Sequence, residues 1–283
     1  MKPENNKNQI LCSTGALIGR PNNRNHKLLK EFVKELACDG YEFMMYDTWY
    51  EKVDEIVQDL QELGVNIPVM HCEKSIGERI SQGGAENLQE AIRLFEINCK
   101  MAKRLSIRQM VIHLWSGVAS DACFENNLKA YAALEEMAKP YGVELLVENV
   151  VCNRENPLTH WCELAEKYPS IRFVFDTKMA AFHRQEELLY EDAYAWLWKN
   201  GHIRHYHVND YLGGYMDWGN LRTLPIGSGQ IDFKVFFAFM KKIQYTGTYT
   251  VEATAFNKEG VVDLAMLNRC FETIRRYLSE TKC

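Results

Sequence analysis

A single α/β barrel of the (β/α)8, or TIM, class is the fold that the sequence predicts, with residues 1–283 forming one domain. Short apolar runs alternate with amphipathic segments along the chain, which is typical of parallel strands joined by helices. The length of 283 residues is also close to the roughly 250 residues that one such barrel takes. We expect residues 1–8, which are polar, to form a flexible N-terminus.

The predicted strands are nearly continuous in apolar character and rich in β-branched and aromatic residues. A parallel strand buried on both faces shows this pattern, whereas a strand with one wet face alternates apolar and polar residues. The runs that meet this description are residues 9–15, 41–46, 67–73, 108–115, 143–150, 171–177, 203–209 and 247–253.

Between these runs, apolar residues recur every three or four positions, as on a helix with one buried face. Stop signals such as Pro140, Pro169 and Gly201 lie at or just past the predicted ends. Two connections are expected to be long loops, residues 72–85 and 211–230, and long loops are usually lids or binding loops. The predicted helices lie near residues 28–36, 53–63, 86–104, 126–139, 158–167, 186–199, 232–243 and 261–278.

A doubly wound open sheet is the alternative fold for the same alternation. Such a sheet normally carries a glycine-rich phosphate-binding turn after its first strand. The segment in that place, STGALIGRPNNRN, offers only Gly15 and Gly19 in a G-x-x-x-G spacing. This spacing is a weak signal for a nucleotide, so the sequence favours the barrel.

Composition narrows the classes of partner and compartment. The formal net charge is -5 and the pI about 6.0, which disfavours a nucleic-acid partner. None of the nine cysteines forms a CxxC pair, so we expect thiols in a reducing cytoplasm. The polar N-terminus lacks a signal peptide's apolar region, and no apolar run approaches the roughly 18 residues of a membrane span. A cytoplasmic protein is expected, and its composition is compatible with a homo-oligomer.

Four predicted strands end in residues that bind hard or borderline metal ions: Glu148, Asp176, His207 and Glu252. Each one alone could cap a helix or form a salt bridge. Together they would place three carboxylates in dry surroundings at one rim of a barrel, where unpaired charges are costly. Oxygen and nitrogen ligands without a thiolate suit one divalent ion such as Mn²⁺, Mg²⁺, Co²⁺ or Zn²⁺.

Other residues are placed to contact a substrate at the same rim. His71 and His113 end two strands in the first half of the chain and are expected to bind substrate hydroxyls, although an isolated histidine there could be a core residue. Lys178 adds a cation close to Asp176. Trp218 could stack on a sugar and Arg222 could bind a hydroxyl or a phosphate, or both could be ordinary loop residues. Five other histidines are interpreted as surface or helix residues: His26, His160, His183, His202 and His205.

The segments VEN, FDT, HVND, LPIGSGQIDF and VEA are similar to those of the xylose-isomerase-like barrel superfamily, which includes sugar epimerases, sugar isomerases and AP endonuclease family 2. The resemblance spans nearly the whole chain. It implies that Glu148, Asp176, His207 and Glu252 hold one divalent metal. It also implies that Glu148 and Glu252 act as the catalytic acid/base pair.

The expected function is therefore a metal-dependent isomerase or epimerase for a sugar or sugar phosphate, working by proton transfer next to a carbonyl through an enediolate. The chain departs from the family at Met179, where a histidine often contacts substrate or a second metal. This departure and the absence of a second histidine after His207 make an AP-endonuclease-like hydrolase a minor alternative. A dehydratase or lyase of the inosose type and a catalytically lapsed carbohydrate-binding barrel remain open.

Overall fold

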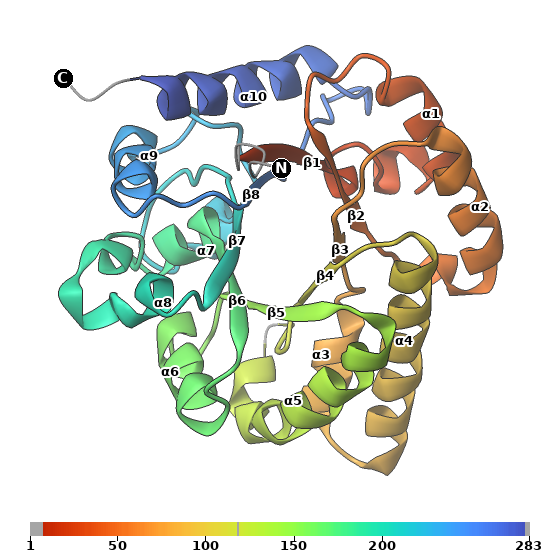
Figure 1. Ribbon diagram of the computed structural model, residues 1–283, viewed down its shortest axis with the longest axis vertical. Helices are drawn as coiled ribbons and strands as arrows, with labels where there is room; N and C mark the ends of the chain where they lie inside the picture. Colours follow the sequence, from red (N-terminus) through yellow and green to blue (C-terminus); the bar gives the residue numbers. More distant parts are fainter. Residues whose placement is uncertain (1–7, 118, 281–283) are drawn as a thin grey trace, which may run out of the picture. The chain divides into compact units, whose positions relative to one another are not determined.

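Eight parallel strands form a closed barrel in the order β1-β2-β3-β4-β5-β6-β7-β8 in the computed structural model, which describes residues 8–117 and 119–280. The predicted TIM-barrel class is confirmed, and Figure 1 shows the helices outside the strands. Residues 1–7, most of the expected flexible N-terminus, lie outside the described residues. The strands are Gln9–Ser13, Gly40–Met44, Val69–His71, Gln109–Ile112, Glu144–Glu148, Arg172–Asp176, Ile203–His207 and Thr248–Val251.

Most of the α-helices lie in segments where the apolar periodicity predicts them, but Ser75–Gln82 and Thr177–Phe182 lie outside the predicted helices. Each of the longer helices turns a stripe of buried side chains inward, as an amphipathic segment does when it covers a sheet. From α1 to α10 they are Leu29–Phe32, Val53–Leu63, Ser75–Gln82, Ala85–Arg104, Phe124–Ala138, Pro157–Lys167, Thr177–Phe182, Trp196–Lys199, Phe233–Lys242 and Leu264–Ser279.

The chain divides into two compact units, Glu42–Phe175 and the remainder, which joins residues up to Tyr41 with those from Asp176 onward. The expectation of one domain for residues 1–283 stays a prediction. The unit Glu42–Phe175 contains β3, β4 and β5, whose parallel register pairs His71 with Val111 and Val111 with Leu146.

The other unit contains β1, β7 and β8. Its register pairs Leu11 and His207 with Thr250 from the two sides of β8, so β8 is the central strand of this group. Helices α9 and α10 pack against each other outside these strands (Figure 1). The carboxyl end of β7 and the segment just after β8 therefore belong to one compact unit.

Three predicted segments differ from the structure. The expected loop 72–85 contains α3, whose Gly77 approaches the strand end so closely that a Cβ there would lie 1.9 Å from the His113 carbonyl oxygen. The expected helix 28–36 stops at Phe32, and Asn268 instead binds the backbone of residues 35 and 37. The expected helix 186–199 is broken because Glu191 is extended.

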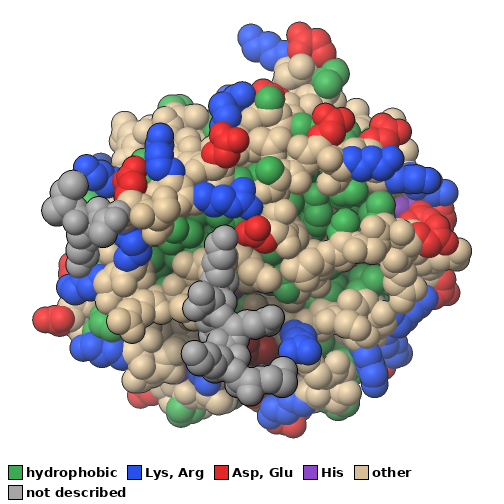
Figure 2. Space-filling view, turned by 45° about the horizontal axis from the view of Figure 1, so that its top comes forward, with side chains coloured by type: hydrophobic (Ala, Val, Ile, Leu, Met, Phe, Trp, Pro, Cys, Tyr) green, Lys and Arg blue, Asp and Glu red, His purple; other side chains and the backbone are tan. Residues whose placement is uncertain are grey.

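The surface and the helices agree with the composition. Figure 2 shows basic and acidic side chains interspersed on the face in view, with apolar side chains between them. Among the described residues, no helix has the length and apolar character needed to cross a membrane. The aromatic residues Trp196 and Trp198 are half-buried and contact His202 and Phe239, so they pack within the unit.

Candidate metal and substrate site

Asp176 is the last residue of β6 and also the N-cap of α7. Its side chain is fully buried, and Oδ1 accepts the backbone N–H of Met179 at 2.9 Å. The other oxygen, Oδ2, accepts the Asn209 side-chain amide at 3.1 Å. The helix-capping role and the ligand role that the sequence offers as alternatives are thus compatible, because they use different oxygens of one carboxylate.

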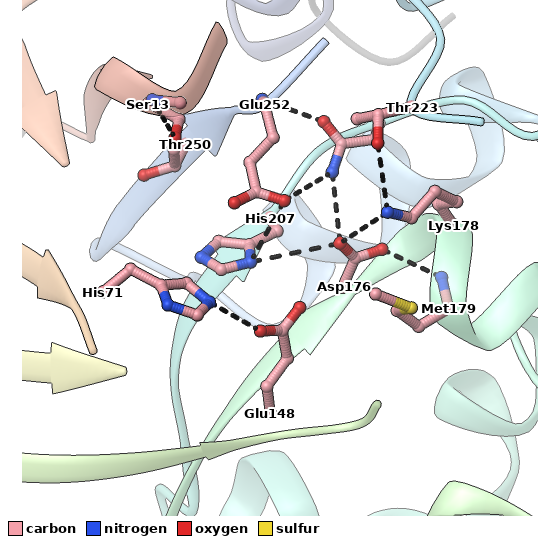
Figure 3. A network of polar contacts seen from close by, with 12 residues as sticks. Ser13, His71, Glu148, Asp176, Lys178, Met179, His207, Thr223, Thr250 and Glu252 are labelled. Atoms are coloured by element: carbon pink, nitrogen blue, oxygen red, sulfur yellow. Dashed lines mark hydrogen bonds and ion pairs between the residues drawn. The ribbon is translucent and has the colours of Figure 1, made fainter. Parts of the chain in front are cut away.

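His207 and Glu252 lie beside Asp176 within the same unit (Figure 3). His207 Nδ1 is 4.0 Å from Asp176 Oδ2 and 3.7 Å from Glu252 Oε2. His207 is fully buried, whereas the Glu252 side chain keeps 14% of its exposure. One possible ligand atom from each residue lies within 4.8 Å of the others. Two carboxylates this close repel each other in a buried site, and a divalent cation between them would relieve the repulsion.

Asn209 links the two carboxylates and was not singled out as a site residue by the sequence. Its Nδ2 donates to Asp176 at 3.1 Å and to Glu252 at 3.3 Å, and its Oδ1 accepts the Glu252 backbone N–H at 2.8 Å. Its own backbone exchanges two hydrogen bonds with the Thr177 hydroxyl. In the sequence, the only indication of this role is that Asn209 follows the dipeptide HV at the end of a predicted strand. An asparagine in that place is hard to distinguish from one in a turn.

Lys178 and Met179 occupy the first turn of α7, next to Asp176. The buried Lys178 places Nζ 4.0 Å from Asp176 Oδ2 and donates to the Thr223 hydroxyl at 3.2 Å. Met179 is also buried, with 8% exposure, and it occupies the sequence position at which the family resemblance leads one to expect a histidine. This side of the site therefore presents a cation and a thioether (Figure 3).

In the unit Glu42–Phe175, two histidines surround the carboxylate of Glu148, which ends β5. His71 Nε2 is 3.2 Å and His113 Nε2 is 2.7 Å from the same oxygen, Oε2. His71 Nδ1 lies 2.7 Å from the carbonyl oxygen of Cys72. Both imidazoles thus contact Glu148, and the substrate contact that the sequence predicts for them stays a prediction.

The folded protein keeps His113 neutral, and for this reason it should be less stable in mild acid than at pH 7. Burial lowers the pKa of His113 to about 4, against the opposing effect of Glu148. As the pH falls from 7 to 5, the unfolded chain, with a histidine pKa of about 6.5, takes up a proton that the folded chain excludes. We expect this histidine to lower the free energy of unfolding by about 2 kcal/mol over that interval.

Urea denaturation of the wild type and of His113→Gln at pH 7 and pH 5 measures this contribution. The variant should lose less stability than the wild type between the two pH values, by the same amount. An identical loss in both proteins would show that His113 titrates equally in the folded and unfolded chains.

The loop after β7 is organised by Asp210. Its carboxylate accepts the backbone N–H groups of Gly227, Gly229 and Ile231 at 2.9, 2.8 and 3.1 Å. A Cβ on Gly229 would lie 2.1 Å from the Tyr211 carbonyl oxygen, so only glycine fits. The predicted long loop 211–230 is therefore anchored at this end.

Two predicted substrate contacts lie in this loop. The Arg222 side chain is exposed. Trp218 is 44% exposed, and its ring packs edge-on against Phe182 at 5.0 Å between ring centres. Both predictions of substrate binding stay predictions.

The remaining histidines, interpreted as surface or helix residues, are all buried: His160 lies in α6 and His26 in a short 3-10 helix, whereas the interpretation is wrong for the other three. All five are between 0% and 7% exposed, and only His160 lies within one of the predicted helices. His205 is an interior residue of β7, and its Nε2 accepts or donates a hydrogen bond with the Thr250 hydroxyl at 3.0 Å. The His205 imidazole can be buried because both of its nitrogens have partners, Thr248 and Thr250, which the residue type alone does not reveal. The five are His26, His160, His183, His202 and His205.

A closed parallel barrel with carboxylates and imidazoles at its strand ends defines the protein as a TIM barrel with candidate metal sites. Residues 31–270 match the family described as Xylose isomerase-like TIM barrel, so the chain belongs to that family. No curated protein matches the sequence.

The solved structures that share this fold include some that are described as sugar epimerases. A D-tagatose 3-epimerase-like protein is 19% identical, with 95% of this chain and 97% of that chain covered and a TM-score of 0.69. D-allulose 3-epimerase from Methylomonas sp., in complex with D-allulose, is 16% identical, with 96% and 97% covered and a TM-score of 0.67. The IOLI protein with a binding zinc atom is 16% identical, with 96% and 98% covered and a TM-score of 0.68.

Proposed function

We propose that the protein is a divalent-metal-dependent isomerase or epimerase that acts on a ketose or a related polyol, with or without a phosphate. The observation that carries the proposal is the group formed by Asp176, His207 and Glu252, each of which offers one ligand atom within 4.8 Å of the other two. This donor set suits Mn²⁺, Mg²⁺, Co²⁺ or Zn²⁺. The similar structures described as epimerases, and the one with bound zinc, support it.

Glu148 is proposed as the fourth ligand. It is the last residue of β5, as Asp176 is of β6 and His207 of β7. In a closed parallel barrel the carboxyl ends of the strands share one rim, and barrel active sites lie there. The contacts of His71 and His113 with Oε2 would then hold Glu148 in one orientation, as outer partners of metal ligands commonly do.

The proposed chemistry is proton transfer at the carbon next to a carbonyl. A bound divalent ion supplies Lewis acidity to the carbonyl oxygen. Glu252, the more exposed of the two glutamates, removes or returns the proton at one side of the substrate, and Glu148 does so at the other. Asn209 holds the Glu252 backbone and carboxylate in place. The Lys178 ammonium, placed by Thr223, offers a hydrogen bond to a substrate hydroxyl.

The test is solvent-deuterium exchange into a panel of ketoses, ketose phosphates and cyclic polyol ketones, followed by product analysis. The enzyme is assayed after metal loading and again after removal of metal by a chelator. We expect exchange on at least one ketose with the loaded protein and loss of exchange on chelation, with recovery when metal is restored.

A dehydrated product from a cyclic polyol ketone would assign the site to a dehydratase instead. Absence of exchange on every ketose, together with no binding of divalent metal, would favour a carbohydrate-binding barrel without catalysis and would refute the proposal.

A further inference from the structure

A second group of metal-ligand side chains lies inside the unit Glu42–Phe175 and shares no residue with the proposed active site. It consists of Asp121, in the short 3-10 helix Ser120–Cys123, Cys152, in the connection after β5, and His160, in the first turns of α6. One ligand atom from each lies within 4.8 Å of the others, and all three residues are buried. A carboxylate, a thiol and an imidazole from three segments are thus brought together without solvent around them.

The carboxylate of this group is held firmly. Asp121 Oδ2 accepts the backbone N–H groups of Asn153, Arg154 and Glu155 at 3.0, 2.6 and 3.2 Å. These bonds fasten the segment just after Cys152 to Asp121. The thiol of Cys152 is fully buried, with Sγ 3.5 Å from the Val150 carbonyl oxygen. Because this segment begins next to Cys152, these bonds hold Asp121 and Cys152 at a fixed separation.

The imidazole is the unexplained member of the group. His160 is 2% exposed, and within the described part of the chain neither ring nitrogen has a hydrogen-bond partner. Its Nδ1 is 3.7 Å from a Glu163 carboxylate oxygen, too far for a hydrogen bond. The ring stacks on Phe124 at 3.7 Å between centres and meets the edge of Trp115 at 5.1 Å. A buried polar atom without a hydrogen-bond partner destabilises the folded state, so a ligand that binds this imidazole would remove an unfavourable feature.

The electrostatic setting favours a ligand histidine. Burial lowers the pKa of His160 to about 4, although Asp121 acts in the opposite direction. The ring is therefore neutral near pH 7, and neutral imidazole is the form that binds metal ions.

We propose that Asp121, Cys152 and His160 form a second metal site, specific for a borderline ion of the Zn²⁺ or Co²⁺ type. Three protein ligands of oxygen, sulfur and nitrogen leave one position of a tetrahedron for water. Bonds of about 2.0–2.3 Å would place the ligand atoms roughly 3.3–3.8 Å apart, which is compatible with a group whose ligand atoms lie within 4.8 Å of one another. The Cys152 S–H bond breaks, its proton passes to solvent, and the metal–sulfur bond forms.

The thiolate distinguishes this site from the oxygen and nitrogen group of the proposed active site. Sulfur ligands favour Zn²⁺ and Co²⁺ over Mg²⁺ and Mn²⁺. The experiment therefore uses Co²⁺ as the probe, because a thiolate bound to Co²⁺ gives a sulfur-to-metal charge-transfer absorption in the near ultraviolet. This signal is independent of enzymatic activity, and its failure would leave the proposed isomerase function untouched.

The full-length protein is stripped with a chelator and titrated with Co²⁺, alongside Cys152→Ser and the control Cys162→Ser. Cys162 is an exposed cysteine on the same helix as His160 and is outside the group. We expect the charge-transfer absorption in the wild type and in Cys162→Ser, and its loss in Cys152→Ser. Circular dichroism without metal checks that the variants fold.

If Cys152→Ser does not fold, His160→Gln takes its place, and its Co²⁺ affinity should fall by at least about 100-fold. Two results would overturn the proposal: no charge-transfer absorption in the wild type at any Co²⁺ concentration, or an unchanged absorption in the variant that folds. Either would mean that Asp121 serves only to fasten the turn.

Discussion

Glu252→Gln should leave the fold intact and reduce solvent-deuterium incorporation at the substrate α-carbon by about 10²–10⁴-fold, the usual contribution of a general acid or base. The amide has nearly the volume of the carboxylate and still offers an oxygen to the Asn209 amide, which lies 3.3 Å from Glu252 Oε2. It cannot accept a proton from carbon. Because glutamine is neutral, the substitution introduces no new charge at this position, where 14% of the Glu252 side chain is exposed.

Metal content must be measured in the same samples, because Glu252 is also proposed as a ligand. Exchange rates should be compared at saturating metal, so that the loss reports proton transfer and not occupancy. Glu259→Gln is the matched control, since it removes an exposed carboxylate from the segment after the same strand. Wild-type exchange in Glu252→Gln would refute the acid/base assignment.

Asp176→Asn should lower the affinity for the divalent ion by more than the roughly 10–100-fold that the loss of an outer partner costs. The substitution removes the charge of a fully buried carboxylate beside His207 and Glu252. It leaves the helix cap in place, because asparagine is as good an N-cap as aspartate and its oxygen can still accept the Met179 N–H. Calorimetric titration with Mn²⁺ measures the effect.

The control for Asp176→Asn is Asp232→Asn. Asp232 caps α9 by accepting the Val235 N–H at 3.0 Å, as Asp176 caps α7, but it is exposed. The Asp232→Asn variant should bind Mn²⁺ with the affinity of the wild type. Its melting temperature should lie within a few degrees of the wild-type value. Unchanged Mn²⁺ affinity in Asp176→Asn would reduce Asp176 to a capping residue and remove it from the proposed site.

The barrel could be predicted because each strand is a nearly continuous apolar run, whereas the apolar residues of the longer helices recur every three or four positions. The placement of Asp176 and His207 followed from the rule that strand ends meet at one rim. The helix α3 was missed because SIGERISQ carries a glycine in its centre, and the reason for that glycine, the nearby His113 carbonyl, lies in another segment.

The polar partners inside the protein were harder to predict than the strand ends. Asn209 and the contacts of His71 with Glu148 join segments far apart in the sequence, and one sequence gives no spacing rule for such pairs. The buried His160 was missed for the same reason, because whether an imidazole is covered depends on Phe124 and Trp115, which belong to a different strand–helix pair.

Asp176 both caps a helix and contacts another site residue, and this matters for any attempt to transfer the site to another protein. One oxygen of its carboxylate starts α7 and the other meets the amide of Asn209, which in turn holds the backbone of Glu252. A protein designer who grafted only the ligand side chains would transfer them without the parts that aim them. The smallest supporting segment that would have to be transferred with the ligands consists of the end of β6 and the first turn of α7. Asn209, two positions beyond the end of β7, would have to accompany it.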